Sequence, residues 1–183
     1  WGFLLIEAAK KYHIKGTGIT LSKEQHREFR ERIEKEGLQD YLTAELMDYR
    51  DLPAMGQKFD RVVSVGMVEH VGRENYHLFI DCVEKALKDG GLFLLHFISA
   101  LKEHPGDPWI KKYIFPGGVV PSLREMISCM ADDNFHVLDV ENLRPHYNRT
   151  LLCWEHNFRE HMEEAEQMFD EKFLRMWELY LSS

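Results

Sequence analysis

Glu69 and His70 follow an apolar run at residues 61–65, where we expect a strand. His96 interrupts a second apolar run at residues 92–98. A carboxylate and an imidazole at the ends of neighbouring strands are groups whose pKa values a protein can shift for acid–base work. A histidine in an apolar run is also compatible with a hydrogen-bonded core residue, so both interpretations stay open on spacing alone.

Polar residues also follow two expected strands nearer the N-terminus. Thr20 ends the first of these strands, where many nucleotide-binding folds place an acid on the ribose. No acid is present, so we expect the Thr20 hydroxyl and the Gln25 amide to hydrogen-bond a ribose instead; the alternative is a strand end followed by a helix cap. Asp48 and Tyr49 follow the second strand. There a carboxylate can accept from an adenine amine while the ring packs on the base, and a solvated turn fits the two residues equally well.

The histidine and cysteine spacings do not predict a metal site. His156 and His161 have the wrong spacing to share one helix face as zinc ligands. Cys82, Cys129 and Cys153 are scattered, odd in number and without a C-x-x-C pair, which argues against a zinc knuckle or a disulfide framework. A reducing cytosol is the simplest compartment for such a chain.

These residues need a scaffold, and the pattern of the chain predicts an α/β fold. Amphipathic helical patterns alternate with short apolar runs, which is typical of a doubly wound, mainly parallel sheet. The last two expected strands would pair as an antiparallel edge, and such sheets bind ligands at the carboxyl ends of their strands. Residues 100–120 lack periodicity and predict a long loop or lid. The expected helices are residues 3–12, 22–36, 76–87, 122–130 and one from 157, and the expected strands are residues 14–20, 43–47, 61–65, 92–98, 135–140 and 150–154.

Composition restricts the partners. The chain has 183 residues, 44% of them hydrophobic and 30% charged, which suits one globular domain. With 23 basic against 31 acidic residues the net charge is -8, which argues against nucleic acid and against a strong polybasic attraction to anionic lipid. No apolar run approaches the roughly 20 residues of a membrane-spanning helix.

Four segments, in this order, closely resemble motifs of the cyclopropane-fatty-acyl-phospholipid synthases. They are SVGMVEHVG at residues 64–72, FLLH at 93–96, DPWIKKYIFPGG at 107–118, and His146-Tyr147 with Thr150-Leu151. A single one of these motifs is weak. Four of them with appropriate spacing are specific, and the resemblance extends over essentially all 183 residues.

The resemblance implies a Rossmann-like class I methyltransferase that adds a methylene group, taken from S-adenosylmethionine, across a cis double bond of a phospholipid acyl chain. It also implies that a bound bicarbonate ion serves as the base. The substrate would be unsaturated phospholipid acyl chains at the membrane surface, with the protein cytoplasmic and peripherally associated with the inner face of the membrane. A homodimer is compatible with the family. The resemblance assigns Glu69, His96, Tyr147 and the backbone of Ile98 to bicarbonate, and Trp1, Gly2, Thr20, Leu21, Gln25, Asp48 and Tyr49 to the cofactor.

The same resemblance predicts that residues 1–183 form a single but partial methyltransferase domain. The first strand, most of the glycine loop around Trp1-Gly2 and a lipid-facing N-terminal portion are expected to be missing, as are two family cysteines. Two alternatives stay open. One is a related methyltransferase acting on an amine or another lipid. The other is an inactive binding module, against which the matched Glu69, His96 and Tyr147 argue.

Overall fold

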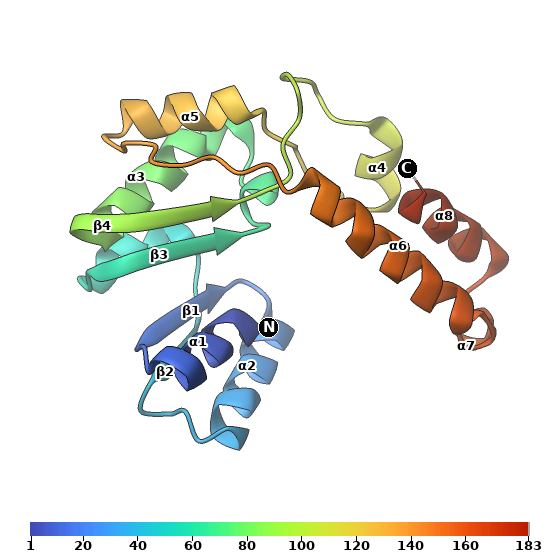
Figure 1. The fold of residues 1–183 in the computed structure, drawn as a ribbon, viewed down its shortest axis with the longest axis horizontal. Coiled ribbons are helices and arrows are strands. Elements are labelled where there is room, and N and C mark those ends of the chain that lie inside the picture. Colours follow the sequence, from blue (N-terminus) through green and yellow to red (C-terminus); the bar gives the residue numbers. More distant parts are fainter. Residues whose placement is uncertain (183) are drawn as a thin grey trace. The chain divides into compact units, whose positions relative to one another are not determined.

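The computed structural model describes residues 1–182 (Figure 1). These residues group into two compact units. Unit 1 comprises Trp1–Val65 and Glu74–His96, and unit 2 comprises Gly66–Arg73 and the chain from Phe97 onward. All named strands of the described residues lie in unit 1. Among residues 1–182, no helix combines the length and the apolar character that crossing a membrane requires.

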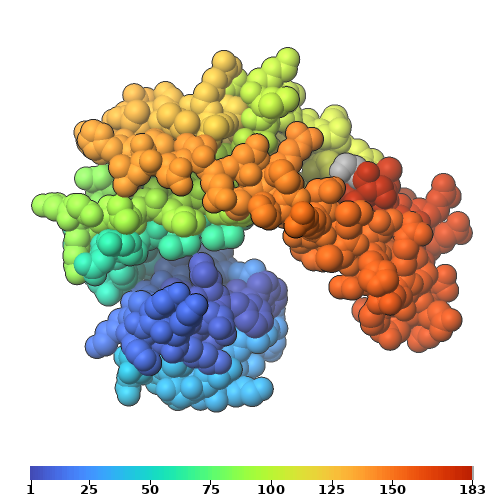
Figure 2. Space-filling model, viewed as in Figure 1, coloured from blue at the N-terminus to red at the C-terminus, as the bar shows by residue number. Residues whose placement is uncertain are grey.

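The first half of unit 1 is a helix followed by a β–α–β arrangement. Strands β1 and β2 run parallel with Thr20 opposite Leu46, so their carboxyl ends share one edge. Ser22 caps α2 by accepting a hydrogen bond from the backbone N–H of Gln25 at 3.3 Å. Figure 2 shows the residues drawn in blue as one contiguous group. The elements are α1 (Phe3–Tyr12), β1 (Gly16–Thr20), α2 (Lys23–Lys35) and β2 (Leu42–Leu46), and their core is Ile6, Ala9, Phe29, Ile33, Leu38 and Leu42.

The second half of unit 1 is another two-stranded parallel sheet, with Val65 opposite His96. Helix α3 contacts both strands. The strand at residues 92–98 was expected to be buried on both faces, and this is wrong. Side chains alternate between half-buried and exposed along β4, with Leu94 55% exposed, because α3 packs against one face only. The elements are η1 (Tyr49–Met55), β3 (Phe59–Val65), α3 (Tyr76–Ala86) and β4 (Leu87–His96).

Unit 2 contains helices and loops. Ser122 and Glu125 form a complete capping box at the start of α5, in which each side chain accepts from the other residue's backbone N–H. The segment at residues 100–120 is mainly loop, as expected, with one short helix in it. The elements are η2 (Val68–His70), η3 (Arg73–Asn75, at the border of the two units), α4 (Pro108–Tyr113), α5 (Leu123–Asp132), α6 (Arg144–Glu160), α7 (Met162–Met168) and α8 (Glu171–Leu181).

The antiparallel edge expected from residues 135–140 and 150–154 is not formed within residues 1–182. The first segment has no regular secondary structure, and Leu138 there is 78% exposed. The second lies inside α6, which starts with Pro145 in its first turn, where the missing proline N–H costs no helical hydrogen bond. The single helix expected from Asn157 is also wrong, since α6 ends at Glu160 and two further helices follow.

Candidate functional site

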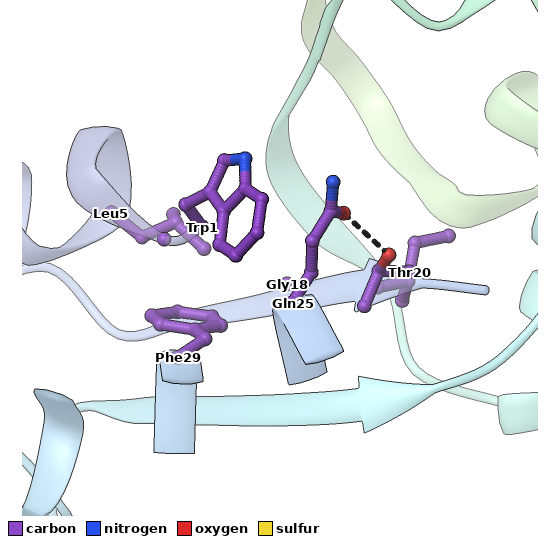
Figure 3. Close-up of a pocket in the computed structure, with 8 residues that line it drawn as sticks. Trp1, Leu5, Gly18, Thr20, Gln25 and Phe29 are labelled. Atoms are coloured by element: carbon purple, nitrogen blue, oxygen red, sulfur yellow. Dashed lines mark hydrogen bonds between the residues drawn. The ribbon is translucent and has the colours of Figure 1, made fainter. Parts of the chain in front are cut away.

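A pocket of about 150 Å³ lies at the carboxyl end of β1 (Figure 3). It is built within unit 1 by the first residues of the chain, the end of β1 and the start of α2. Small-molecule sites commonly enclose about 300–1,000 Å³, so this pocket suits one part of a nucleoside-sized ligand. Its lining residues are Trp1, Gly2, Leu5, Gly18, Ile19, Thr20, Gln25 and Phe29.

The polar edge of the pocket is held by a short hydrogen-bond chain. The Thr20 hydroxyl donates to Gln25 Oε1 at 2.8 Å and accepts from the backbone N–H of Ser22 at 3.1 Å. Because this uses the amide oxygen of Gln25, the amide nitrogen is directed away from Thr20, as Figure 3 shows. The expected capping box at Ser22 is therefore only half formed, since the Gln25 side chain serves the pocket edge instead. Gln25 Nε2 can donate to a hydroxyl of a bound ligand.

The apolar wall depends on Gly2, which the resemblance assigned to the cofactor, and on Gly18, which the sequence did not single out. A Cβ atom added to Gly18 would lie 2.7 Å from Phe29 Cε1, and one added to Gly2 would lie 1.9 Å from Phe29 Cδ2. Phe29 from α2 therefore packs directly on the backbone of β1, with Leu5 beside it. The Gly-x-Gly pattern at Gly16 and Gly18 inside a strand was the available signal of this close approach.

Asp48 and Tyr49 lie beside the pocket but do not line it. The backbone N–H of Met47 donates to the Thr20 carbonyl at 3.0 Å, which holds the loop after β2 next to the end of β1. The Asp48 carboxylate accepts hydrogen bonds from Arg50, and these lower its pKa. The Tyr49 ring meets Phe79 of α3 edge to face, with centroids 5.4 Å apart, and burial raises the pKa of its phenol. Leu21, assigned to the cofactor as well, is exposed and lies outside the pocket lining.

Glu69 in unit 2 has the arrangement most suggestive of chemistry. Its side chain is only 8% exposed. Oε1 accepts a hydrogen bond from the backbone N–H of Ile98 at 2.8 Å, while Oε2 has no partner among residues 1–182. The Glu69 carbonyl also accepts from the backbone N–H of Val119 at 2.8 Å. Burying a carboxylate oxygen without a partner is costly, so Glu69 is positioned to receive a proton donor from a ligand.

The other two predicted catalytic residues are exposed. His96 is the last residue of β4 in unit 1 and is exposed, so it is not part of the core that residues 1–182 form. Tyr147 lies within α6 of unit 2, where it was expected to precede a strand; it is 38% exposed and meets Trp154 edge to face at 6.2 Å. The structure therefore brings Glu69 and Ile98 together and leaves both other side chains accessible.

The fold and pocket define a Rossmann-like α/β protein of the class I methyltransferase type. Two solved structures are similar to it. Mycolic acid cyclopropane synthase CmaA1 in complex with SAH and CTAB gives a TM-score of 0.88 at 28% identity, covering 99% of this chain and 67% of that one. Cyclopropane synthase MmaA2 from Mycobacterium tuberculosis gives a TM-score of 0.87 at 26% identity, with the same coverage.

Sequence comparison defines the family. The family described as mycolic acid cyclopropane synthetase matches residues 1–183, and the chain belongs to this family. It is 42% identical over its full length to a "Probable fatty acid methyltransferase" of Pseudomonas putida and 41% identical to the cyclopropane-fatty-acyl-phospholipid synthase of Escherichia coli K12. The chain spans 48% and 46% of the length of these two relatives.

Proposed function

We propose that this chain is the cofactor-binding and catalytic part of an S-adenosylmethionine-dependent enzyme that adds a methylene group across a cis double bond of a phospholipid acyl chain. The family membership and the similarity to the cyclopropane-fatty-acyl-phospholipid synthase of Escherichia coli support the proposal. The observation that carries it is the buried Glu69 carboxylate, with one oxygen fixed by the Ile98 N–H and the other unpartnered among residues 1–182.

One part of S-adenosylmethionine fits the pocket of unit 1. Thr20 and Gln25 offer hydrogen-bonding groups for ribose hydroxyls, and Trp1 and Phe29 offer apolar surface. The neighbouring Asp48 offers an acceptor for an exocyclic amine. With Gly2, Leu21 and Tyr49, these are the residues that we assign to the cofactor. When bound, S-adenosylmethionine supplies an electrophilic methyl group on its sulfonium.

A bicarbonate ion fits the unpartnered oxygen of Glu69. Bicarbonate carries one O–H that can donate to Oε2 of Glu69. On the family resemblance we also assign His96 and the Tyr147 hydroxyl to this ion, as donors to its other oxygens. The N–H of Ile98 is engaged by Glu69, so the backbone of Ile98 contributes by orienting that carboxylate. Bound there, bicarbonate would supply the base that the closure of a cyclopropane ring needs.

The residues of this chain must also exclude water, because a cationic acyl chain is captured by water as an alcohol. Aromatic side chains of unit 2 supply apolar surface near Glu69-His70. The His70 and Phe115 rings lie edge to face at 6.3 Å, and Phe115 meets Tyr180 at 6.0 Å. The ring centroids of Trp109 and Tyr113, both in α4, lie 5.9 Å apart.

We further propose that residues 1–183 act as one partial methyltransferase domain. Their partner is the unsaturated acyl chain of phospholipids at the inner face of the membrane, with which the protein associates peripherally from the cytoplasm. A homodimer is compatible with this proposal, and size-exclusion chromatography with light scattering tests it. Nucleic acid is not expected as a partner, given the net charge of -8.

Labelled methyl transfer tests the proposal. Full-length protein is incubated with methyl-tritiated S-adenosylmethionine and phosphatidylethanolamine vesicles whose acyl chains are either monounsaturated or saturated. Label should enter the fatty acids of the unsaturated vesicles alone. Label in the ethanolamine head group would instead identify an amine methyltransferase, and binding of the cofactor without label transfer to either vesicle would identify an inactive module.

A further inference from the structure

Asp48 is held by a neighbour that sequence reasoning did not assign. Oδ1 accepts from both the backbone N–H and the Nε–H of Arg50, each at 2.9 Å. Oδ2 accepts from Arg50 Nη2 at 2.7 Å. The guanidinium thus grips both carboxylate oxygens in the fork geometry that makes arginine–carboxylate pairs directional.

These hydrogen bonds from Arg50 restrict the ligand groups that Asp48 can recognise. An ionised carboxylate has about four acceptor positions, two on each oxygen. Arg50 occupies both positions on Oδ1 and one on Oδ2, which leaves a single acceptor position on Oδ2. A free carboxylate can rotate to accept from a neighbouring donor on the base edge, such as the N1–H of a 6-oxopurine. The held carboxylate offers one acceptor in one orientation.

The surroundings stabilise this state. The Asp48 side chain is 17% exposed and that of Arg50 is 61% exposed, so the pair lies at the edge of unit 1 with the carboxylate on the inner side. The Arg50 guanidinium lies 6.0 Å from the centroid of the Tyr49 ring, and that ring rests on Phe79. The hydrogen bonds from Arg50 lower the pKa of Asp48 and so favour the ionised, hydrogen-bond-accepting form of its carboxylate.

We infer that Arg50 is a specificity-determining residue, which fixes Asp48 as a single acceptor for the 6-amino group of adenine and against 6-oxopurines. This inference rests on the proposed binding of S-adenosylmethionine. A 6-oxopurine turns a carbonyl oxygen toward the remaining lone pair of Oδ2, and two acceptors repel. Because Arg50 prevents rotation of the carboxylate, Asp48 cannot turn to reach the N1–H of such a base. Arg50 acts through Asp48 and is a positioning residue.

Calorimetry with two probes tests the inference on the full-length protein. The probes are S-adenosylhomocysteine and its 6-oxo counterpart S-inosylhomocysteine. Arg50→Met should weaken S-adenosylhomocysteine binding about two- to tenfold, the scale of one hydrogen bond. It should weaken S-inosylhomocysteine binding less, so the ratio of the affinities for the two probes, which measures the preference for adenine, should decrease. Arg50→Lys should resemble Arg50→Met, because an ammonium group keeps the charge and loses the fork.

The matched control is Arg30→Met, which removes an exposed arginine of α2 that lies 4.0 Å from Glu34. It should leave both affinities unchanged, and the melting temperatures of all variants should agree. The inference is overturned if Arg50→Met keeps the wild-type ratio of affinities for the two probes. It is also overturned if Arg50→Lys matches the wild type, because a positive charge at position 50 would then be sufficient without the guanidinium fork. If the wild type binds neither probe, the proposed cofactor is wrong and the inference falls with it. Binding of S-adenosylhomocysteine with an unchanged preference in Arg50→Met refutes the inference alone.

Discussion

Glu69→Gln separates the two oxygens of the buried carboxylate. Glutamine keeps one carbonyl oxygen, which can still accept from the Ile98 N–H as Oε1 does at 2.8 Å. The amide nitrogen replaces Oε2, the oxygen without a partner among residues 1–182, and turns an acceptor into a donor. The substitution therefore preserves the local fold and removes only the feature that we assign to the bicarbonate ion.

The expected loss follows from that single bond. A hydrogen bond to a charged group contributes about 1.5–3 kcal/mol. If Glu69 makes this bond to the base in the transition state, turnover should fall about 10- to 150-fold, at about 1.4 kcal/mol per factor of ten. Cofactor affinity should change little, because Glu69 lies outside the pocket lined by Thr20 and Gln25.

Steady-state label transfer, calorimetry with S-adenosylhomocysteine and a melting curve are measured on each variant. Glu69→Ala should lose both turnover and stability, because the Ile98 N–H then lacks its partner as well. Glu74→Gln, an exposed glutamate nearby in the chain, is the matched control and should behave as wild type. Wild-type turnover in a folded Glu69→Gln protein would show that Oε2 has no part in the chemistry.

Three further predictions concern the cofactor, the base and the pH. Thr20→Ala with Gln25→Ala should weaken S-adenosylhomocysteine binding by about 1–3 kcal/mol, the scale of two hydrogen bonds, and unchanged calorimetric affinity in a folded protein would remove both from the site. Bicarbonate should stimulate the depleted wild-type enzyme and stimulate Tyr147→Phe less, which a turnover titration measures; equal stimulation would contradict the assignment. Burial of Glu125 opposes its ionisation, yet hydrogen bonds from Arg73 and the Ser122 backbone lower its pKa. Arg73→Met should thus lower stability by its full amount above the unfolded pKa of about 4.3, and this loss should disappear as the pH falls through the lower pKa of folded Glu125. Acid titrations of the melting temperature of the wild type and the variant measure it.

Local signals predicted the helices of the first unit well, because each of these helices is determined by nearby residues. The capping serine at Ser22 and the stop at Gly37 delimit α2, observed at Lys23–Lys35. The apolar stripe that begins at Tyr76 predicted α3, observed at Tyr76–Ala86. In each case the helix is specified by its own cap and its own apolar face.

The errors in the second unit fall where a pattern is ambiguous. Residues 150–154 combine threonine, leucine, cysteine and tryptophan, which suits a buried strand or a helix equally on such a short run. Pro145 in the first helical turn was the signal that favours α6. Four of the six residues at 135–140 are apolar, which suits a strand, yet a strand also requires a neighbouring strand, and within residues 1–182 no named strand pairs with this segment.

The site divides in the same way. The residue types at Glu69 and Thr20 predicted polar groups at or after strand ends. Thr20 is the last residue of β1, and Glu69 lies in η2, four residues after the end of β3. The bond between Glu69 and the Ile98 N–H joins residues far apart in sequence, so no local pattern predicts it from residue types alone. The grip of Arg50 on Asp48 is a side-chain conformation, which neighbouring residue types permit without requiring.

Deuterium counting tests the central claim most directly. Full-length protein is incubated with S-adenosylmethionine carrying a fully deuterated methyl group and with monounsaturated phospholipid, and the released fatty acids are analysed by mass spectrometry. Ring closure removes one of the three methyl hydrogens, so the account predicts a fatty acid that gains one carbon, retains two deuterium atoms and resists hydrogenation as a cyclopropane. A product that retains all three deuterium atoms in a simple methyl branch, or an unlabelled fatty acid despite cofactor binding, would contradict it.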